Sequence, residues 1–266
     1  MKKIMLLLCA AAFLAVACDK EEPVPTPENP ANPSDTTQVD PSEEVFIPNA
    51  VTDIDGNSYD AVRIGEQVWM ASNLRTTKYA DNTPIPLGDT ASYTNPYRYA
   101  PNNDEGNVAE YGYLYNWAAM MHGASSSTAN PSGVQGICPN GWHVPSDAEW
   151  TQLTDYVSSH SEYVCSGNGA NIAKALAADH GWQITAYNEC AVSYDQSSNN
   201  ASGFSALPAG CYSGSYGNFG LYAYFWSATE DSDNKAYLRY LGYDGAAVSM
   251  YNYSKSYGFS VRCLRD

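Results

Sequence analysis

The segment Gly136-Ile-Cys-Pro-Asn-Gly-Trp-His-Val-Pro-Ser-Asp-Ala-Glu-Trp150 contains the clearest helix start in the chain. Ser146 is suited to cap a helix N-terminus, and Glu149 follows it three residues later, which is the spacing of a capping box. Three apolar residues then repeat at the spacing of one helix face: Trp150, Leu153 and Val157. The pattern predicts a short helix that begins after Ser146.

Strand patterns lie on both sides of this helix. Asp55-Gly56 and Asp244-Gly245 are hairpin signals between segments rich in β-branched and aromatic residues. The predicted strands cover residues 51–54, 59–64, 67–74, 236–242, 246–253 and 257–264.

A second short helix, rich in alanine, is predicted over residues 170–178, where Gly181 can end it. Residues 113–122 also have a short helical pattern. A chain that begins and ends with strands and carries two short helices between them indicates an α+β fold. We expect antiparallel strands, with the two termini paired in one sheet.

Five further segments are collinear with the one quoted first: Val51-Thr-Asp-Ile-Asp-Gly-Asn-Ser-Tyr59, Gln67-Val-Trp-Met-Ala-Ser-Asn-Leu74, Gly203-Phe-Ser-Ala-Leu-Pro-Ala-Gly210, Phe225-Trp-Ser-Ala-Thr-Glu230 and Ser256-Tyr-Gly-Phe-Ser-Val-Arg-Cys-Leu-Arg-Asp266. Through these six segments the chain resembles the Fibrobacter succinogenes major paralogous domain. The resemblance covers nearly all of residues 50–266, and we expect one domain over residues 46–266.

That family is in turn similar to the C-type-lectin-like fold, in the branch that includes formylglycine-generating enzymes. The resemblance implies that the terminal strands pair. Formylglycine-generating enzymes bind copper through a cysteine pair near the end of the chain, whereas this sequence has only Cys263 there. We therefore expect the fold to carry over and the activity not to, with no cofactor.

The domain contains five cysteines, namely Cys138, Cys165, Cys190, Cys211 and Cys263. Outside the inner membrane such cysteines form disulfides, and five allow fifteen ways to make two bridges, which local spacing leaves open. We predict Cys165–Cys190 and Cys138–Cys263, with Cys211 unpaired, and the family resemblance favours the second bridge. In the chain-entropy model, the loop of about 125 residues that Cys138–Cys263 would close stabilises the fold by roughly 4–5 kcal/mol.

The N-terminus has the pattern of a lipoprotein signal. Lys2 and Lys3 precede an apolar run over residues 4–16, which is too short to span a membrane, since a spanning helix needs about 20 residues. Small residues before Cys18 resemble a lipobox, which predicts removal of residues 1–17 and acylation of Cys18, including palmitate. The alternative is an ordinary secretory signal cut near Ala17.

Residues 18–45 form a proline-rich acidic linker that lacks the apolar side chains to form a core. Its first residues, Asp19-Lys20-Glu21-Glu22, resemble a surface-export signal, so we expect outer-membrane anchoring that faces the cell exterior; any solvated linker start can look similar. The domain has 10 basic and 21 acidic residues, a formal charge of -11. This charge repels nucleic acid and anionic membrane surfaces, so membrane contact is expected through the lipid alone.

Neither a catalytic motif nor a metal-binding motif stands out. None of the four histidines lies in a nucleophile motif, and we interpret His143 as a packed structural residue and Glu149 as a helix cap. Residues 53–57 and 231–234 carry oxygen ligands of the kind that calcium takes, but a hairpin and a solvated turn explain them better. The sequence predicts no metal site and no enzyme.

Tyrosine is the unusual feature, because 12 of the chain's 22 tyrosines fall between residues 187 and 257 among Ser, Gly, Asn and Ala. Such a mixture is typical of binding surfaces, since tyrosine offers a large rigid contact at low entropy cost. Strand packing is the alternative explanation. The predicted ligand-binding residues are Tyr212, Tyr216, Tyr222, Tyr224, Leu238, Tyr240, Asp244, Tyr251, Asn252 and Tyr253.

These features predict a monomeric surface lipoprotein that binds a glycan or a protein through its C-terminal strands. The first alternative is a structural or adhesive subunit of a surface assembly, which a large contiguous apolar patch would favour. The second is an enzyme, which would need a cleft with convergent titratable groups.

Overall fold

The computed structural model describes residues 45–184 and 187–266. The predicted signal peptide, the lipidation site Cys18 and the linker up to residue 44 lie outside the described residues. Within the described part, no helix is long and apolar enough to cross a membrane.

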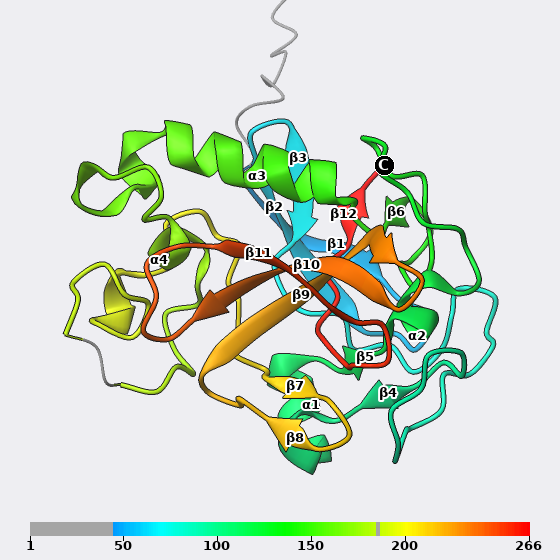
Figure 1. Cartoon of the computed structure of the whole chain (residues 1–266). Helices are drawn as coiled ribbons and strands as arrows, with labels where there is room; N and C mark the ends of the chain where they lie inside the picture. Colours follow the sequence, from blue (N-terminus) through cyan, green and yellow to red (C-terminus); the bar gives the residue numbers. More distant parts are fainter. Residues whose placement is uncertain (1–44, 185–186) are drawn as a thin grey trace, which may run out of the picture. The chain divides into compact units, whose positions relative to one another are not determined.

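The described chain is an α+β structure, as predicted (Figure 1). The strands are β1 (Phe46–Thr52), β2 (Ser58–Ile64), β3 (Gln67–Met70), β4 (Arg98–Tyr99), β5 (Leu114–Tyr115), β6 (Trp142–His143), β7 (Cys211–Tyr212), β8 (Tyr216–Gly217), β9 (Tyr222–Ser232), β10 (Lys235–Gly242), β11 (Ser249–Ser254) and β12 (Leu264–Arg265). The α-helices are α1 (Val108–Tyr111), α2 (Trp117–Met121), α3 (Asp147–Ser159) and α4 (Ala173–Leu176).

The strands nearest the two ends of the described chain lie in one five-stranded antiparallel sheet, in the order β1-β2-β3-β12-β6. The prediction that both termini share a sheet is confirmed. The direct partners of β12 are β3 and β6, however, and β1 lies at the edge beside β2, so the terminal strands do not pair with each other. A second sheet of three antiparallel strands has the order β11-β10-β9.

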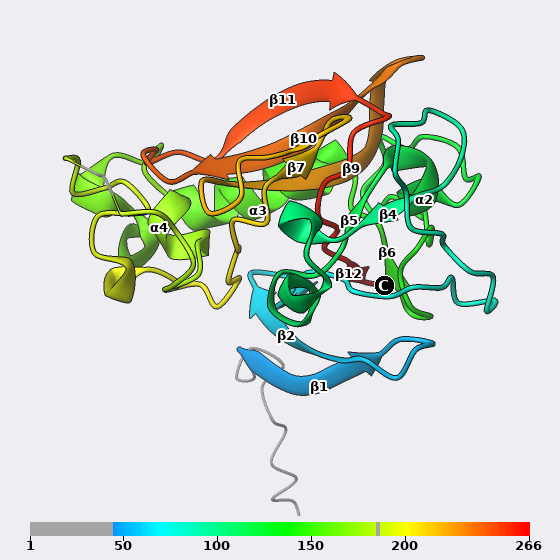
Figure 2. The same cartoon turned by 90° about the horizontal axis from the view of Figure 1, so that it is seen from below.

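Helix α3 crosses the three-stranded sheet on one face (Figures 1 and 2). Its capping box forms as predicted, because the Ser146 and Glu149 side chains each bond the other residue's backbone N–H. Trp150, Leu153 and Val157 are buried, and Trp150 Nε1 donates to the Trp226 carbonyl of β9 at 3.2 Å. The predicted apolar face is therefore the face that packs on the sheet.

The segment that precedes β12 runs between the two sheets and divides its backbone hydrogen bonds among several partners. Phe259 exchanges two with Tyr115, Ser260 bonds both Tyr224 and Trp226, and the Val261 carbonyl accepts from Leu74. The expected strand over residues 257–264 is therefore regular only at Leu264–Arg265, because no single neighbour runs beside it for its whole length.

Three other predicted elements are shorter than expected. Residues 113–122 divide into β5 and α2, because Asn116 lies between them and its side chain accepts from Ala119 N as a helix cap. The alanine-rich helix is only the single turn α4, after which the chain leaves the helix to bond Ala206. The third strand ends at Met70 rather than at residue 74.

Both predicted disulfides are present, Cys138–Cys263 and Cys165–Cys190, and Cys211 is unpaired among the cysteines of residues 45–184 and 187–266. Cys138 and Cys263 are fully buried, and their bridge joins the segment before β6 to the segment before β12. The bridge thereby fixes the chain's end to the same sheet that contains β1.

Candidate functional site

Five of the six tyrosines in the three-stranded sheet lie on the face opposite α3, and the sixth, Tyr237, lies on the α3 side. Cross-strand pairing places Tyr224 beside Tyr240, and Tyr251 beside Leu238. Because side chains alternate between the faces of a strand, Tyr222, Tyr240 and Tyr253 point the same way. We call this set the tyrosine face: Tyr222, Tyr224, Tyr240, Tyr251 and Tyr253.

The rings of the tyrosine face form one continuous network. Ring centroids are 5.6 Å apart for Tyr222–Tyr224, 5.9 Å for Tyr224–Tyr240, 6.4 Å for Tyr224–Tyr253 and 5.2 Å for Tyr251–Tyr253. Tyr251 is 55% exposed, and Tyr222, Tyr240 and Tyr253 are partly exposed. Aromatic rings fixed by one another offer a contact surface that loses little entropy when a ligand binds.

Three predicted ligand-binding residues, Leu238, Tyr224 and Tyr212, are buried. Leu238 has no exposed surface, because Tyr251 and Trp226 flank it on the same face, and Tyr224 is covered by Phe259. Tyr212 belongs to the β7–β8 hairpin and is only 4% exposed, at the edge of a hollow beside that hairpin. Leu238 and Tyr224 therefore support the exposed rings.

Asn252 and Asp244 also differ from the prediction in their placement. Asn252 pairs with Tyr237 and so points to the α3 side of the sheet, away from Tyr251 and Tyr253. Asp244 lies exposed in the turn between β10 and β11, and its negative charge contributes to a raised pKa of Tyr222, for which burial is the larger cause. Asp244 is therefore at the rim of the tyrosine face.

Tyr212 and Tyr216 belong to a second aromatic group, on the β7–β8 hairpin. Tyr212 stacks on Tyr99 with centroids 4.0 Å apart, and Tyr216 meets Tyr212 at 5.0 Å. The two groups are joined by Asn218, whose side chain donates to the Tyr224 hydroxyl at 3.0 Å and lies 3.8 Å from the Cys211 sulfur. Burial raises the pKa of the Cys211 thiol, which keeps it protonated at neutral pH.

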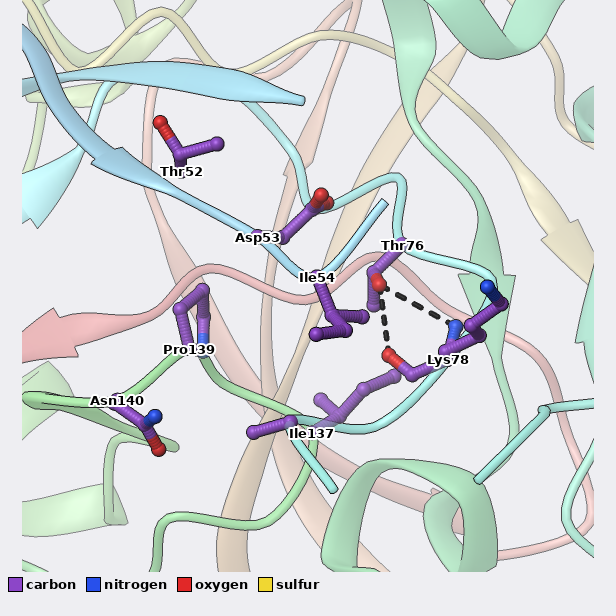
Figure 3. A pocket seen from close by; sticks show the side chains of 9 residues that line it. Thr52, Asp53, Ile54, Thr76, Lys78, Ile137, Pro139 and Asn140 are labelled. Carbon is purple, nitrogen blue, oxygen red and sulfur yellow. Dashed lines mark hydrogen bonds between the residues drawn. The ribbon is translucent and has the colours of Figure 1, made fainter. Parts of the chain in front are cut away.

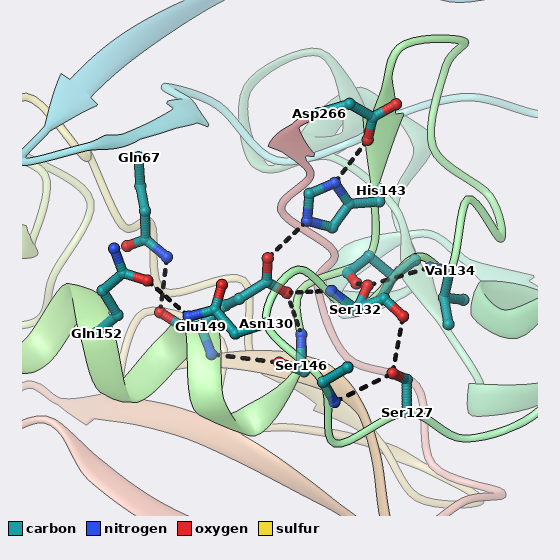
Figure 4. Close-up of polar contacts among 12 residues, drawn as sticks. Gln67, Ser127, Asn130, Ser132, Val134, His143, Ser146, Glu149, Gln152 and Asp266 are labelled. Carbon is teal, nitrogen blue, oxygen red and sulfur yellow. Dashed lines mark hydrogen bonds and ion pairs between the residues drawn. The ribbon is translucent and has the colours of Figure 1, made fainter.

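His143, a buried residue of β6, lies between two carboxylates, the buried one of Glu149 and the exposed one of Asp266. Its Nδ1 is 2.7 Å from an Asp266 carboxylate oxygen and its Nε2 is 2.8 Å from Glu149 (Figure 4). The other Glu149 oxygen accepts from the backbone N–H groups of Ser132 and Ser146. A hollow of about 300 Å³ opens beside His143 and Asp266. Both ring nitrogens are engaged by carboxylates, so His143 links β6 to the cap of α3 and to the C-terminal residue.

The stability of the fold should fall when His143 loses its proton. Burial alone lowers the pKa of His143, but the hydrogen bonds and charges of Glu149 and Asp266 outweigh it and raise the pKa above the ordinary value. A raised pKa contributes stability that is complete below the unfolded value, about 6.5, and is lost as pH rises through the folded value. Urea unfolding at pH 6 and pH 9 should give a lower free energy at pH 9.

The control for this pH dependence is His143→Gln, which keeps hydrogen-bonding capacity but has no titrating proton. Its unfolding free energy should change less between pH 6 and pH 9 than that of the wild type. An equal change in both proteins would assign the pH dependence to other groups.

A further hollow of about 180 Å³ lies beside the β1–β2 turn (Figure 3). Asp53 faces it, but its carboxylate already accepts from Asp55 N at 3.0 Å, from Asn57 N at 2.9 Å and from the Tyr59 hydroxyl at 2.5 Å. The carboxylate thus holds the predicted hairpin turn together. Within the described residues, no group of three or more His, Cys, Asp or Glu side chains is placed to hold a metal ion.

Several residues of these surfaces were not identified from sequence. Tyr257 extends the tyrosine face, with its ring 5.9 Å from Tyr253. Asp89 and Asn103 lie beside Tyr212 and Tyr216 around a hollow of about 360 Å³. Tyr257 belongs to a quoted family segment and could have been found, whereas Asp89 and Asn103 lie in the loop-rich part of the chain, where no periodicity indicates a partner.

Comparisons with known proteins give one match. No curated protein and no solved structure matches this chain. The family model named Fibrobacter succinogenes major domain matches residues 62–265, from within β2 to within β12. This match confirms the resemblance carried by the motifs around Ser146 and at the C-terminus. The chain belongs to the Fibrobacter succinogenes major domain family.

Proposed function

We propose that this protein is a lipoprotein, anchored through Cys18 in the outer membrane, that binds a glycan or protein ligand at the cell exterior through its tyrosine face. One observation carries the proposal: five tyrosines from three adjacent strands form a continuous ring network that remains partly exposed. Tyrosine rings suit both sugar rings and protein surfaces, because each ring combines an apolar face with a polar hydroxyl.

The hydroxyls of this face act as neutral hydrogen-bonding groups. Burial raises the pKa of the partly exposed Tyr222 and Tyr253, and neighbouring tyrosines, together with Asp244 beside Tyr222, add to the shift, so both remain protonated at neutral pH. A protonated phenol both donates and accepts hydrogen bonds. The face therefore favours ligands that carry hydroxyl or amide groups next to apolar surface.

A structural or adhesive subunit is the second candidate, and the edge strand β11 favours it. β11 lies at the end of its sheet, and Met250 and Tyr251 are both more than half exposed there. The strand carries no charge and no proline, which are the usual protections of an exposed edge. A partner strand added to β11 would change the oligomeric state without any small ligand.

Binding should be lost when the exposed rings are removed. Cells that display the chain are incubated with a panel of glycans and surface proteins, alongside a Tyr240→Ala, Tyr251→Ala, Tyr253→Ala variant. We expect affinity to fall by at least about tenfold, because tyrosine side chains that become buried on binding carry a large part of the binding energy of many interfaces. A Cys18→Ser chain should bind the same ligand but be recovered in the soluble fraction rather than on cells.

The matched control is a Tyr187→Ala, Tyr194→Ala variant, which removes two exposed tyrosines that lie off the tyrosine face. It should bind like the wild type, and thermal unfolding of each variant checks the fold. Binding that survives the triple substitution would remove the tyrosine face from the proposal. An absence of any ligand together with self-association through β11 would favour the assembly subunit.

A further inference from the structure

The hollow beside the β7–β8 hairpin has the size of a small-ligand site. Its volume is about 360 Å³, within the range of roughly 300–1,000 Å³ typical of ligand pockets. Three segments that are distant in sequence line it, with Asp89 from the first, Asn103 from the second, and Tyr212, Ser215 and Tyr216 from the hairpin. A ligand there would contact side chains that only the folded protein brings together.

The floor of this hollow is rigid because two glycines allow the rings beneath it to pack. A Cβ at Gly88 would lie 2.5 Å from Tyr99 Cε1, and one at Gly258 would lie 2.7 Å from Tyr99 Cδ2. The Tyr99 hydroxyl donates to the Thr90 carbonyl at 2.9 Å, which fixes the loop that carries Asp89. Tyr212 and Gly258 also exchange two backbone hydrogen bonds, so the hairpin is held against the segment before β12.

Polar groups at the rim remain available to a ligand. Among the described residues, none donates a hydrogen bond to the Asp89 carboxylate, and the side chains of Asn103 and Tyr216 also make no hydrogen bond. Asp89 and Asn103 are exposed, and Tyr216 is partly exposed. The negative charge of Asp89 contributes to the raised pKa of Tyr212, after burial, which places the carboxylate near that hydroxyl.

The charge of the hollow selects against anions. Of the residues that the structure describes, no lysine or arginine lines it, Asp89 supplies a full negative charge, and Glu105 is close enough to contribute to the raised pKa of Tyr216. An acidic sugar or a phosphate would be repelled. A carboxylate, an amide and a partly exposed aromatic ring are suited instead to the vicinal hydroxyls and the apolar face of an uncharged sugar ring.

We infer that this hollow is a subsite for one uncharged sugar residue of a glycan, an inference that rests on the proposed ligand-binding function and names its ligand class. Asp89 accepts hydrogen bonds from two sugar hydroxyls, Asn103 bonds a further oxygen, and the ring stacks on Tyr216. The remainder of the glycan extends toward the tyrosine face, to which Asn218 joins the hairpin.

The test measures binding of methyl hexosides and N-acetylhexosamines to the Cys18→Ser chain by saturation-transfer NMR and calorimetry. Asp89→Asn should weaken binding by roughly tenfold, because hydrogen bonds to a charged group are the stronger class. Tyr216→Ala should weaken it similarly, whereas Tyr216→Phe, which keeps the ring, should retain most of the affinity. Glucuronic acid and sialic acid should not bind.

Asp155→Asn and Tyr194→Ala are the matched controls, since both residues are exposed and lie outside the hollow. Sugar binding that Asp89→Asn leaves unchanged, but that the triple substitution on the tyrosine face removes, would overturn this subsite and leave the proposed function intact. Preference for an amine over neutral sugars would also overturn it. Absence of any ligand for either surface would overturn both proposals together.

Discussion

Replacing Cys138 and Cys263 together by alanine should cost roughly 4–5 kcal/mol of unfolding free energy in the chain-entropy model. The bridge joins residues 125 positions apart, so its loss releases more than half of the domain in the unfolded state. Both sulfurs are fully buried, so the substitution also leaves small cavities. Urea unfolding of the Cys18→Ser chain, followed by fluorescence and circular dichroism, measures the change.

The second bridge provides the matched control. Cys165 and Cys190 are only 25 positions apart, and the same model assigns their loop roughly 3–4 kcal/mol. The variant that lacks Cys165–Cys190 should therefore be less destabilised than the variant that lacks Cys138–Cys263. Equal losses would mean that local packing, rather than loop length, decides the contribution of each bridge.

The helix after Ser146 could be predicted well because its signals are local. A capping box and an apolar face depend on residues within one or two turns, and both formed as the spacing indicated. The sequence did not reveal that Glu149 also binds His143 and the Ser132 backbone. These contacts depend on the loop before β6 and on β6 itself, whose placement no periodicity encodes.

The last segment was less predictable, although its residues alternate like a strand. A strand pattern shows that a segment can pair, but not how many partners will share it. Here Phe259, Ser260 and Val261 each bond a different part of the chain, so the backbone is extended without forming one ladder. The position of this segment between two sheets is a property of the whole fold.

The tyrosine face was predicted in part, because alternation separates the two faces of a strand but does not say which is exposed. On the face of β10 that carries Leu238 and Tyr240, only the Tyr240 end is exposed, since Leu238 is buried. The opposite face is covered by α3, where Arg239 forms an ion pair with Asp147. Exposure therefore varies among residues of the same face, whereas alternation along the strand only assigns each residue to one face or the other.

Replacing Arg262 by methionine should destabilise the domain by at least about 3 kcal/mol, because buried acceptors would lose their donors. Arg262 has no exposed surface and donates to the Asn73 side chain at 2.8 Å, to the Met70 carbonyl at 2.9 Å, and to the carbonyls of Phe204 and Ser205. Burial lowers its pKa to about 9, so the guanidinium is still charged at neutral pH. Urea unfolding at pH 7 measures the loss.

Two further variants separate the geometry of Arg262 from its charge. Arg262→Lys keeps a positive charge, but a single ammonium group cannot reach all of the acceptors that lie around the planar guanidinium. This variant should therefore also be strongly destabilised. Arg265→Met, at an exposed position three residues later, should change stability by less than about 0.5 kcal/mol. A methionine variant as stable as the wild type would mean that the four hydrogen bonds only offset the cost of burying the charge. Loss in both Arg262 variants would mean that the shape of the guanidinium fixes the last segment between the sheets.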